Sequence, residues 1–560
     1  MAIKPLAPFR LWVLQNFPFI AEDFDALTNY ELMCKIVEYL NNVIDVTNNQ
    51  TNEINNLLNW FNNLDVQEEI NNKLDKMVED GTLAEIIEPY MENLTNEVQI
   101  AIDNANTAID NANTASDTAT SMVNQVGTIV NKLRHDLSRE YTKFELPETM
   151  NNWFKNITIL KAIDKNNYNY ILDLERLKNT GGNIIYVDCN NADTGDGTEL
   201  NPYKSLKTAL SNSSDNDTII VKEGIYYRQN LNNTSSQSWN NVNIICEPHT
   251  LFTTGEALTW TQNETYSNVY QANRTNVQDC IDIRNRKRDL LPHLTRVSSI
   301  QNCSNTTYSW YTDNSIVYVN LGENVTNDKI LCNLQLGYRA FNMIANSKAL
   351  HIYIENATFI AGRDGIIRAR GTDTYDMEFI ANNCKFLYSP VASIDGLPIE
   401  GAKSILVNCE ASFNSKDGFN YHSNENTKCY AIEVNCIAQA NGLGDAENHS
   451  YNGSTIHDGG QIIRINGNYF DNNGGNITDI DSNTVSLNFN CNCFDSQANT
   501  EDEYCTDFTC KYGTVKMYLY NCFAQGKSYK NMYCSPSTAQ MTLDNCKYDS
   551  IDGNGTFIIN

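Results

Sequence analysis

Basic residues are scarce in this chain. Its 560 residues include 40 Lys and Arg against 68 Asp and Glu, for a formal net charge of −28. A protein that binds nucleic acid needs a basic surface to neutralise the phosphates, and a protein that docks on an anionic membrane needs one as well. The composition therefore excludes both kinds of partner.

Long apolar runs are also missing. The stretch "MAIKPLAPFRLWVLQNFPFI" is interrupted by Arg10, Gln15 and Pro18, so it lacks the continuous apolar segment of a signal peptide. No window is long enough to span a membrane. We therefore expect the chain to be made and folded in a cytoplasm, without membrane insertion. Its 17 cysteines, an odd number, are then expected to be buried thiols and not a disulfide framework.

The first third of the chain predicts associating helices. Apolar residues recur at heptad spacing from Met33 to Leu64, and residues 101–135 divide into consecutive heptads that begin with "AIDNANT". A strict seven-residue repeat imposes a left-handed supercoil between helices. We expect a coiled coil between copies of the chain, and an amphipathic helix packed on its own domain is the alternative.

The C-terminal two-thirds contains a short repeat, in which Asn precedes Cys or another small residue. The repeated asparagines are Asn356, Asn383, Asn408, Asn435, Asn466, Asn492, Asn521 and Asn545. They cover 189 residues in seven steps, a mean of 27. Short strands with an asparagine at one corner of each repeat are typical of a parallel β-helix, in which equivalent asparagines stack about 4.8 Å apart. The blades of a propeller, about 40 residues each, fit this spacing less well.

These patterns predict a mostly β chain with four parts. We expect a helical N-terminal region at 1–90, a coiled-coil stalk at 91–140, a connector and cap at 141–216, and a parallel β-helix at 217–560. A short helix at 202–210 would cover the first coil, because an open strand edge invites aggregation.

Several segments are similar to stretches of known proteins. "NFPFIAEDFDALTNYELMCKIVEYLNNVID" and "EEINNKLDKMVEDGTLAEII" look like a virion-attachment region, and "YVDCNNADTGDGTELNPYKSLKTAL" is similar to the opening motif of right-handed β-helix proteins of the pectate-lyase-like class. "DGFNYHS" and "NGSTIHDGGQIIRINGNYFDNNGGNITDID" look like segments of phage tail β-helix proteins. The chain thus resembles the receptor-binding tail spikes and appendages of phages that infect Gram-positive bacteria, most weakly over residues 225–350.

This resemblance implies a right-handed parallel β-helix in a homotrimer on the virion tail. Its N-terminal region would attach to tail or neck proteins. Its β-helix would adsorb to the host cell surface and bind, and often degrade, a cell-wall glycan or teichoic acid. The C-terminal trimerisation or chaperone domain that is common in such spikes has no counterpart in the sequence.

Histidines are few, and three of the seven lie between residues 422 and 457 among several aspartates. Carboxylates one or two coils apart would be separated by about 5 or about 10 Å, which brackets the separations in retaining and inverting glycosidases. The repeat step from Asn435 to Asn466 is also the longest, at 31 residues, and extra loop residues often line a site. The catalytic candidates are Asp417, His422, Asp445, His449, His457, Asp458, Asp479 and Asp481. The candidates for substrate binding are Tyr421, Tyr451, Arg464 and Tyr469.

Two reactions fit these candidates. In a glycoside hydrolase, two of the aspartates would act as acid and as nucleophile or base. In a teichoic-acid phosphodiesterase, a histidine with Asp479 or Asp481 would activate water, with a divalent metal ion as an open alternative. That ion, or the basic side chains of Arg363, Arg368, Arg370 and Arg464, would offset the repulsion between an acidic groove and an anionic substrate. A non-catalytic adhesin and a structural virion fibre also stay open, and Asp417 followed by glycine is by itself a turn dipeptide.

Overall fold

The computed structural model divides the chain into two compact units. The described residues are 52–57, 59, 99, 102–104, 106, 141–163, 167–228, 231–232, 239–334, 340–360, 366–389, 395–442, 451–496 and 505–560. Most of the first unit, including nearly all of both predicted heptad segments, lies outside them. The described pieces at 52–57 and 102–104 are helical, and the coiled coil stays a prediction. No helix in the described part is long and apolar enough to cross a membrane.

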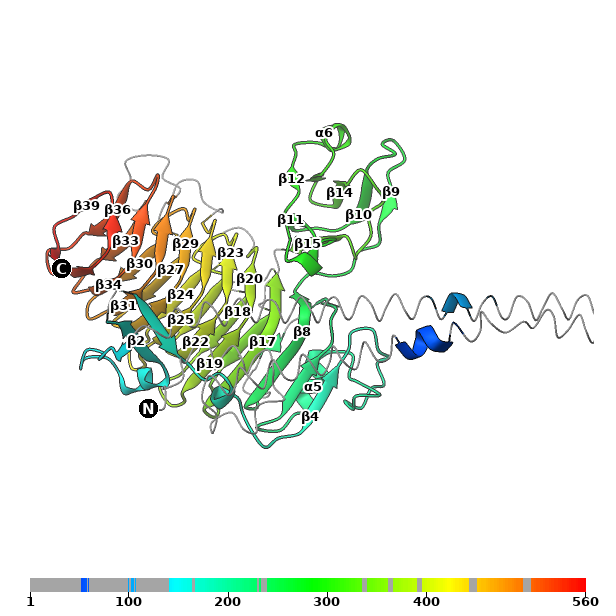
Figure 1. The fold of residues 1–560 in the computed structure, drawn as a ribbon. Helices are drawn as coiled ribbons and strands as arrows, with labels where there is room; N and C mark the ends of the chain where they lie inside the picture. Colours follow the sequence, from blue (N-terminus) through cyan, green and yellow to red (C-terminus); the bar gives the residue numbers. More distant parts are fainter. Residues whose placement is uncertain are drawn as a thin grey trace, which may run out of the picture. The chain divides into compact units, whose positions relative to one another are not determined.

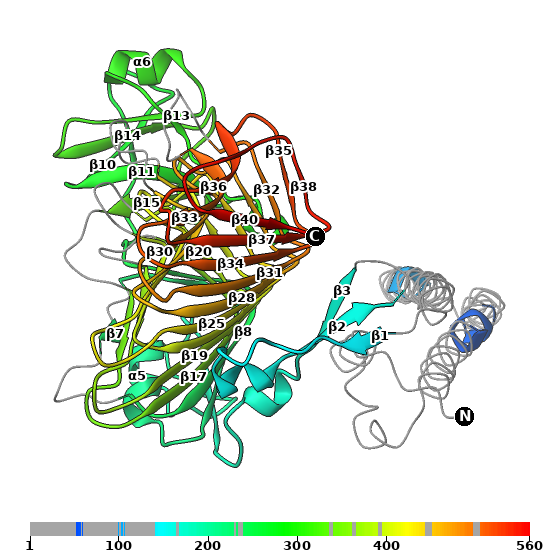
Figure 2. The same cartoon turned by 90° about the vertical axis from the view of Figure 1, so that its left-hand side faces the viewer.

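The second unit is a parallel β-solenoid, which confirms the predicted parallel β architecture (Figure 1). Its coils contribute strands to three faces, which Figure 2 shows from the end that carries β40. Face 1 contains β4 (Ile184–Val187), β5 (Thr218–Val221), the first part of β8 (Val242–Thr253), the first part of β17 (Leu350–Ile360), β19 (Met377–Asn382), β22 (Lys403–Val407), β25 (Tyr430–Val434), β28 (Gln461–Ile465), β31 (Val485–Phe489), β34 (Lys516–Tyr520), β37 (Gln540–Asp544) and β40 (Thr556–Ile559).

In the regular coils face 2 continues from face 1 after a corner of two residues. It contains β6 (Ile225–Tyr226), the second parts of β8 and β17, β20 (Lys385–Leu387), β23 (Glu410–Ser412), β26 (Ile437–Gln439), β29 (Asn468–Phe470), β32 (Asn492–Phe494), β35 (Phe523–Gln525) and β38 (Lys547–Tyr548). Face 3 contains β7 (Leu231–Asn232), β16 (Phe341–Ile344), β18 (Ile367–Arg370), β21 (Leu397–Glu400), β24 (Phe419–His422), β27 (Ser454–His457), β30 (Ile477–Ile480), β33 (Thr506–Lys511), β36 (Lys530–Cys534) and β39 (Ile551–Asp552).

The core of the solenoid lies between the three faces. Successive side chains of a strand point to opposite sides of its sheet, so the apolar alternation of each strand places every second side chain inside. Phe359 stacks on Phe252 of the preceding coil at 5.2 Å between ring centroids and on Phe386 of the next at 5.7 Å. All three are fully buried. Stacking of like residues therefore continues from coil to coil.

The predicted asparagine ladder forms the corner between faces 1 and 2. Asn435 Nδ2 donates to Asn408 Oδ1 at 3.0 Å, and Asn466 Nδ2 donates to Asn435 Oδ1 at 3.1 Å. These corner residues have φ near +50 to +60°, a left-handed conformation that Asn tolerates better than most residues.

One member of the ladder was assigned wrongly from the sequence. In the stretch "NCNC" the corner residue is Asn490, with φ of 50°, and not Asn492. Asn490 Nδ2 donates to Asn466 Oδ1 at 2.9 Å, whereas Asn492 lies in β32 and donates to Asn468. The step from Asn490 to Asn521 is therefore also 31 residues, so the long step after Asn435 is not unique.

The cysteines are thiols in the described part of the chain. All 16 described there are free, and 14 of them are buried. Several follow the corner asparagines and point into the core, where Cys436 Sγ donates to the carbonyl oxygen of Leu406 at 3.5 Å. The expectation of buried thiols is confirmed for these residues.

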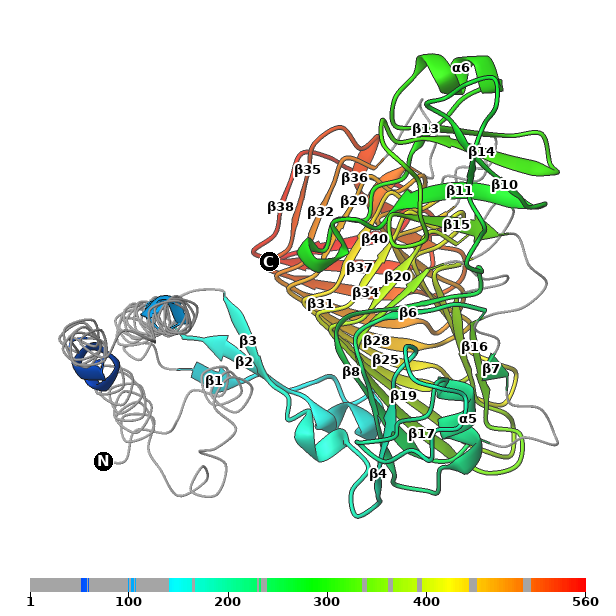
Figure 3. The same cartoon turned by 90° about the vertical axis from the view of Figure 1, so that its right-hand side faces the viewer.

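A mostly antiparallel subdomain interrupts the solenoid between β8 and β16, which corrects the prediction of an unbroken β-helix over 217–560 (Figure 3). It has a five-stranded sheet in the order β12-β13-β14-β10-β9, a β11–β15 pair, and its own apolar core around Trp310 and Val317. Its elements are β9 (Thr261–Gln262), β10 (Tyr270–Asn273), β11 (Val277–Asp282), η4 (Arg286–Arg288), β12 (Thr295–Arg296), α6 (Ile300–Asn305), β13 (Ser309–Thr312), β14 (Ile316–Asn320) and β15 (Ile330–Leu334).

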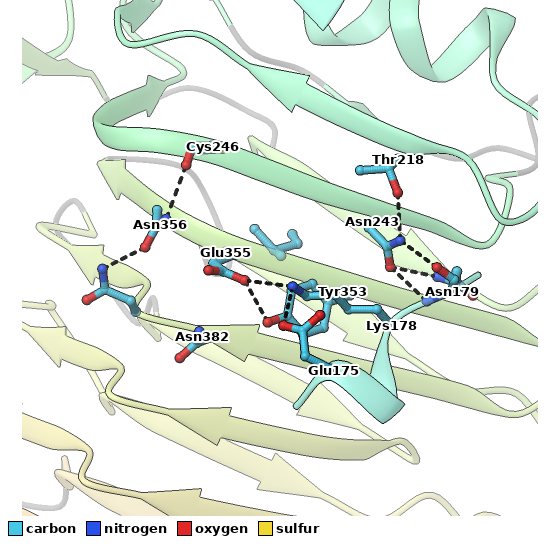
Figure 4. A network of polar contacts seen from close by, with 12 residues as sticks. Glu175, Lys178, Asn179, Thr218, Asn243, Cys246, Tyr353, Glu355, Asn356 and Asn382 are labelled. Atoms are coloured by element: carbon cyan, nitrogen blue, oxygen red, sulfur yellow. Dashed lines mark hydrogen bonds and ion pairs between the residues drawn. The ribbon is translucent and has the colours of Figure 1, made fainter. Parts of the chain in front are cut away.

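The segments that precede the solenoid contain β1 (Tyr141–Lys143), η2 (Asn152–Asn156), β2 (Thr158–Ala162), β3 (Tyr168–Ile171) and η3 (Glu175–Leu177), and α5 (Leu206–Asn212) follows β4. Within the second unit, η2 and the residues after η3 contact the outside of face 1. Trp153 Nε1 donates to Glu378 Oε1 at 2.7 Å. Figure 4 shows the contacts near the first coils. Lys178 Nζ lies 3.6 Å from Glu355 Oε2, and the backbone N–H of Asn179 donates to Asn243 Oδ1 at 2.9 Å.

Candidate functional site

A groove with a volume of about 400 Å³ lies on the outer side of face 3. Its lining residues lie on or next to β24, β27, β30 and β33 and in the segments before β24 and β27. Figure 1 shows these four strands side by side on face 3. The lining residues are Lys416, Asp417, His422, Tyr451, Asn452, His457, Thr478, Ile480, Asp481, Thr509, Lys511 and Tyr512.

The last residues of β24 and β27 form a histidine pair in the groove. His422 and His457 are in register, and their rings stack with centroids 4.1 Å apart. His457 Nε2 lies 2.9 Å from Thr455 Oγ1. Burial, followed by the interactions with His422, Lys416 and Lys511, lowers the pKa of His457 well below its ordinary value. His457 is therefore a neutral imidazole at physiological pH.

Two aspartates occupy equivalent turn positions, each directly after a strand of face 3. Asp458 comes after β27 and Asp481 after β30, with φ of 60° and 73°. Asp458 Oδ2 lies 3.2 Å from His422 Nδ1, and Asp481 Oδ2 lies 4.0 Å from His457 Nδ1. Burial and then the Asp458 carboxylate raise the pKa of Asp481. The two carboxyl groups and the two imidazoles thus form one cluster.

The Asp-Gly dipeptide suggests that Asp417 is an exposed turn residue. In the structure only 4% of Asp417 is exposed. Its Oδ1 accepts hydrogen bonds from Asn452 N at 2.5 Å and from Asn452 Nδ2 at 3.0 Å. Burial and the nearby Asp395 raise the pKa of Asp417 to about 7, against the opposing effects of Lys416 and Asn452. At pH 7 about half of the Asp417 carboxyl groups therefore keep their proton.

Asp395 and Lys416 support Asp417 and were missed in the sequence. Lys416 Nζ lies 3.6 Å from Asp395 Oδ1, and Asn420 Nδ2 donates to Asp395 Oδ2 at 2.9 Å. The pattern that indicates Asp395 is present: Asp-Gly occurs at 395–396 and again at 417–418, and Leu397 pairs with Phe419 in the next coil. Lys511 and Tyr512 were also missed, because their place beside the histidines depends on the strand register.

Four predicted site residues lie in the interior and not in the groove. Tyr421, Arg464, Tyr469 and Asp479 are all 0% exposed. Tyr421 and Tyr469 donate to the buried Glu433, at 2.8 and 2.5 Å. Arg464 Nη2 lies 3.1 Å from Asp479 Oδ1. This placement corrects the expectation that these side chains face a substrate, since each occupies an inward position of its strand.

The other predicted residues are placed as follows. Tyr451 lines the groove and is 8% exposed. Arg370 lies outside the groove, with Nε 3.5 Å from Glu400 Oε2, and Arg368 pairs with the same carboxylate. Asp445, His449 and Arg363 lie outside the described residues. Among the described residues, no group of three or more His, Cys, Asp and Glu is arranged to hold a metal ion.

No protein-family model and no curated protein matches the sequence. Among solved structures, the chain is similar to XylC in complex with xylose, with 11% identity, a TM-score of 0.40, and coverage of 65% of this chain and 70% of that one. It is similar to pectate lyase Pel9A, with 14% identity, a TM-score of 0.31, and coverage of 67% and 81%. It is also similar to the tailspike protein gp49 of Acinetobacter baumannii bacteriophage Fri1, a capsular polysaccharide depolymerase, with 7% identity, a TM-score of 0.24, and coverage of 75% and 69%. Likeness at this level carries no argument about activity, so the function must be argued from the groove.

Proposed function

We propose that the chain is a phage tail spike whose groove on face 3 binds a polysaccharide of the bacterial cell surface and hydrolyses its glycosidic bonds. One observation carries this proposal. A buried carboxyl group, Asp417, has a pKa of about 7 and lines the same groove as a second carboxyl group, Asp481. A glycosidase needs one acid that is still protonated and one carboxylate that attacks or activates water, and the groove holds a candidate for each part.

Asp417 takes the part of the general acid. Asn452 binds its Oδ1 twice, which orients the carboxyl group and leaves Oδ2 to carry the proton. That proton would pass to the glycosidic oxygen as the bond to the leaving sugar breaks. The raised pKa leaves about half of the Asp417 carboxyl groups protonated at pH 7, whereas an ordinary aspartate would be ionised.

Asp481 takes the part of nucleophile or base. Its raised pKa makes the carboxylate more basic than an ordinary aspartate. The neutral His457 beside it would hydrogen-bond a sugar hydroxyl. Tyr451 and Tyr512, which also line the groove, would pack their rings against the apolar faces of sugar rings.

We also propose that the β-helix is right-handed, that the N-terminal region is a coiled coil that attaches to tail or neck proteins, that the spike is a homotrimer, and that its host is a Gram-positive bacterium. The heptads of residues 33–64 and 101–135 support association of copies. A non-catalytic adhesin would use the same groove for binding alone, and a teichoic-acid phosphodiesterase would attack a phosphodiester there.

The test is Asp417→Asn, which keeps the acceptor for Asn452 and removes the acid. We expect release of reducing ends from purified host cell wall to fall by a factor of about 10² to 10⁴, with binding to whole cells retained. Asp376→Asn is the matched control, because Asp376 is an exposed aspartate paired with Lys403 of face 1. Wall binding without any cleavage by the unmodified protein would identify an adhesin, and phosphate-ester cleavage would identify the phosphodiesterase.

A further inference from the structure

The inserted subdomain contains two cysteines that face each other across a pair of strands. Cys280 of β11 and Cys332 of β15 are directly opposite in the antiparallel pairing of these strands. Their sulfur atoms lie 3.8 Å apart, and both residues are buried in the apolar core of the subdomain. A bond between the two sulfur atoms would therefore join β11 to β15.

The backbone hydrogen bonds place the two cysteines where a disulfide fits. The Cys280 carbonyl oxygen accepts from Leu294 N at 2.8 Å and so is not used to pair with β15. Three positions further on, Ile283 N donates to the Lys329 carbonyl oxygen at 2.9 Å. Hydrogen-bonded and non-hydrogen-bonded pairs alternate along an antiparallel ladder, so Cys280 and Cys332 form a non-hydrogen-bonded pair. Opposite Cα atoms of such a pair are about 4.5 Å apart, within the range of about 4.4–6.8 Å that disulfides span.

The same two strands attach the subdomain to the solenoid. Ile281 and Leu331 are the next opposed pair, and successive side chains of a strand point to opposite sides. Both pack in a buried cluster with Leu251 and Ile360 of face 2. A cross-link between β11 and β15 would therefore fix the strand pair on which the subdomain rests.

The cysteines of the solenoid offer an internal comparison. Cys384, Cys409 and Cys436 are equally buried, but they follow the corner asparagines and are not opposed across an antiparallel pair. Each directs its thiol to a carbonyl oxygen of the preceding coil, at 3.7, 3.4 and 3.5 Å. Burial is thus shared by both sets of cysteines, and the strand geometry distinguishes them.

We propose that Cys280 and Cys332 are a redox-responsive pair, which stays as two thiols in reducing surroundings and closes to a disulfide when a low-molecular-weight disulfide is the oxidant. The disulfide fixes the β11–β15 pair and holds the subdomain closed. This inference goes beyond the proposed function and does not depend on hydrolysis in the groove.

The reaction is a thiol–disulfide exchange in two steps. The thiolate of Cys332, the less buried of the two, attacks one sulfur of oxidised glutathione and releases a glutathione thiolate. The Cys280 thiolate then attacks the Cys332 sulfur and releases the second glutathione. Two protein thiols are oxidised, one glutathione disulfide is reduced, and the two protons end on the two glutathione molecules. Burial raises the pKa of the Cys280 thiol, so the exchange proceeds when the strands open locally.

The experiment incubates the full chain with oxidised glutathione at about pH 8, near the ordinary pKa of a thiol. A second sample is refolded from urea in the same mixture. The remaining thiols are then blocked, and linked peptides are mapped by mass spectrometry. We expect a peptide that joins Cys280 to Cys332 as the main cross-link and its loss with dithiothreitol. Cys332→Ala should abolish it, and Cys303→Ala, which removes another buried cysteine of the same subdomain, is the matched control and should retain it.

The cross-link should also protect the subdomain from proteases. Because a disulfide removes open states of the chain between its two ends, cleavage between residues 283 and 329 should slow by about tenfold or more in the oxidised protein. Dithiothreitol should reverse the protection. Cys332→Ala should show no protection, and Cys280→Ala takes its place if that variant fails to fold.

Three results would overturn the inference. They are the absence of a Cys280–Cys332 peptide from both samples, cross-links that form mainly between solenoid cysteines such as Cys384 and Cys409, and a Cys280–Cys332 cross-link that leaves cleavage of the subdomain unchanged. A cross-link in the refolded sample alone would support the inference, because it shows that the folded strand pair accepts the disulfide.

Discussion

At the scale of single residues, the environment of Asp417 destabilises its ionised form, and the same environment lets it keep a proton for catalysis. It is buried beside Asp395, and neither burial nor a like charge favours ionisation. The hydrogen bonds from Asn452 reduce this penalty without abolishing it. An unfavourable electrostatic environment of this kind is expected where a group must hold a proton that an exposed carboxylic acid would lose.

Asp417→Asn should make the fold more stable at high pH. The pKa of Asp417 rises from an ordinary 3.8 to about 7 on folding, so its protonated form is favoured in the folded state. Stability is therefore fully present below pH 3.8 and is lost as the pH rises through 7. Asn mimics the protonated form, and at about 1.4 kcal/mol per pKa unit the gain at pH 8 is on the order of a few kcal/mol. Melting curves of both proteins at pH 5 and pH 8 should diverge at the higher pH. Equal shifts at both values would show that the aspartate is ionised throughout.

Asp395→Asn should move the pH profile of hydrolysis without abolishing the reaction. Asp395 touches no substrate in the proposed mechanism, but its charge raises the pKa of Asp417. Without it, Asp417 loses its proton at lower pH, so the alkaline limb of the kcat profile shifts toward acid while the maximal rate stays within a few fold. Asp395→Glu should restore much of the original profile. An unchanged alkaline limb would assign the raised pKa to burial alone.

At the scale of elements, the strands of the central coils bury charge inside the solenoid. Glu433 of β25, Arg464 of β28 and Asp479 of β30 are all 0% exposed. Arg464 Nε also donates to Ser454 Oγ at 2.9 Å, and that serine donates to Glu433 at 2.7 Å. This network lies beneath the strands that form the groove, and it ties three successive coils together.

Arg464→Met should destabilise the solenoid strongly, because it leaves two buried carboxyl groups without their cation. Removing one partner of a buried ion pair typically costs roughly 3–5 kcal/mol. Arg370→Met, on the outer side of face 3 and 42% exposed at its side chain, should cost less than about 1 kcal/mol. Chemical denaturation of the two variants makes the comparison. Similar midpoints would mean that the interior network is dispensable.

At the scale of the whole molecule, the heptads of residues 33–64 and 101–135 predict a parallel homo-oligomer. Leaving their apolar seams in water would be costly, so association should persist at micromolar protein. Mass photometry of the full chain should show an oligomer, trimeric if the resemblance to tail spikes holds. A chain that lacks residues 1–135 should lose this assembly, and a stable monomer of the full chain would refute the prediction.

Much of the solenoid follows from the sequence alone, because its coils repeat. Alternating strands, a corner asparagine and a mean step of 27 residues define a coil without knowledge of its neighbours. The subdomain over residues 261–334 was not predicted, because its sequence has no such repeat. The gathering of His422, His457, Asp458 and Asp481 was also predictable, since equivalent positions in successive coils must stack.

Only the tertiary structure decided which side chains reach the groove. A shift of one residue along a strand moves a side chain from the outer surface to the core. Tyr421 is therefore buried while its neighbour His422 lines the groove. In the same way, Asp479 is buried while its neighbours Thr478 and Ile480 line the groove. The partners of Asp417 come from neighbouring coils: Asp395 lies 22 positions before it in the chain and Asn452 lies 35 after it. The sequence by itself determined the coil and the residue types at its corners. The register between coils, set by packing of the core, decided their exposure, their charge and their partners.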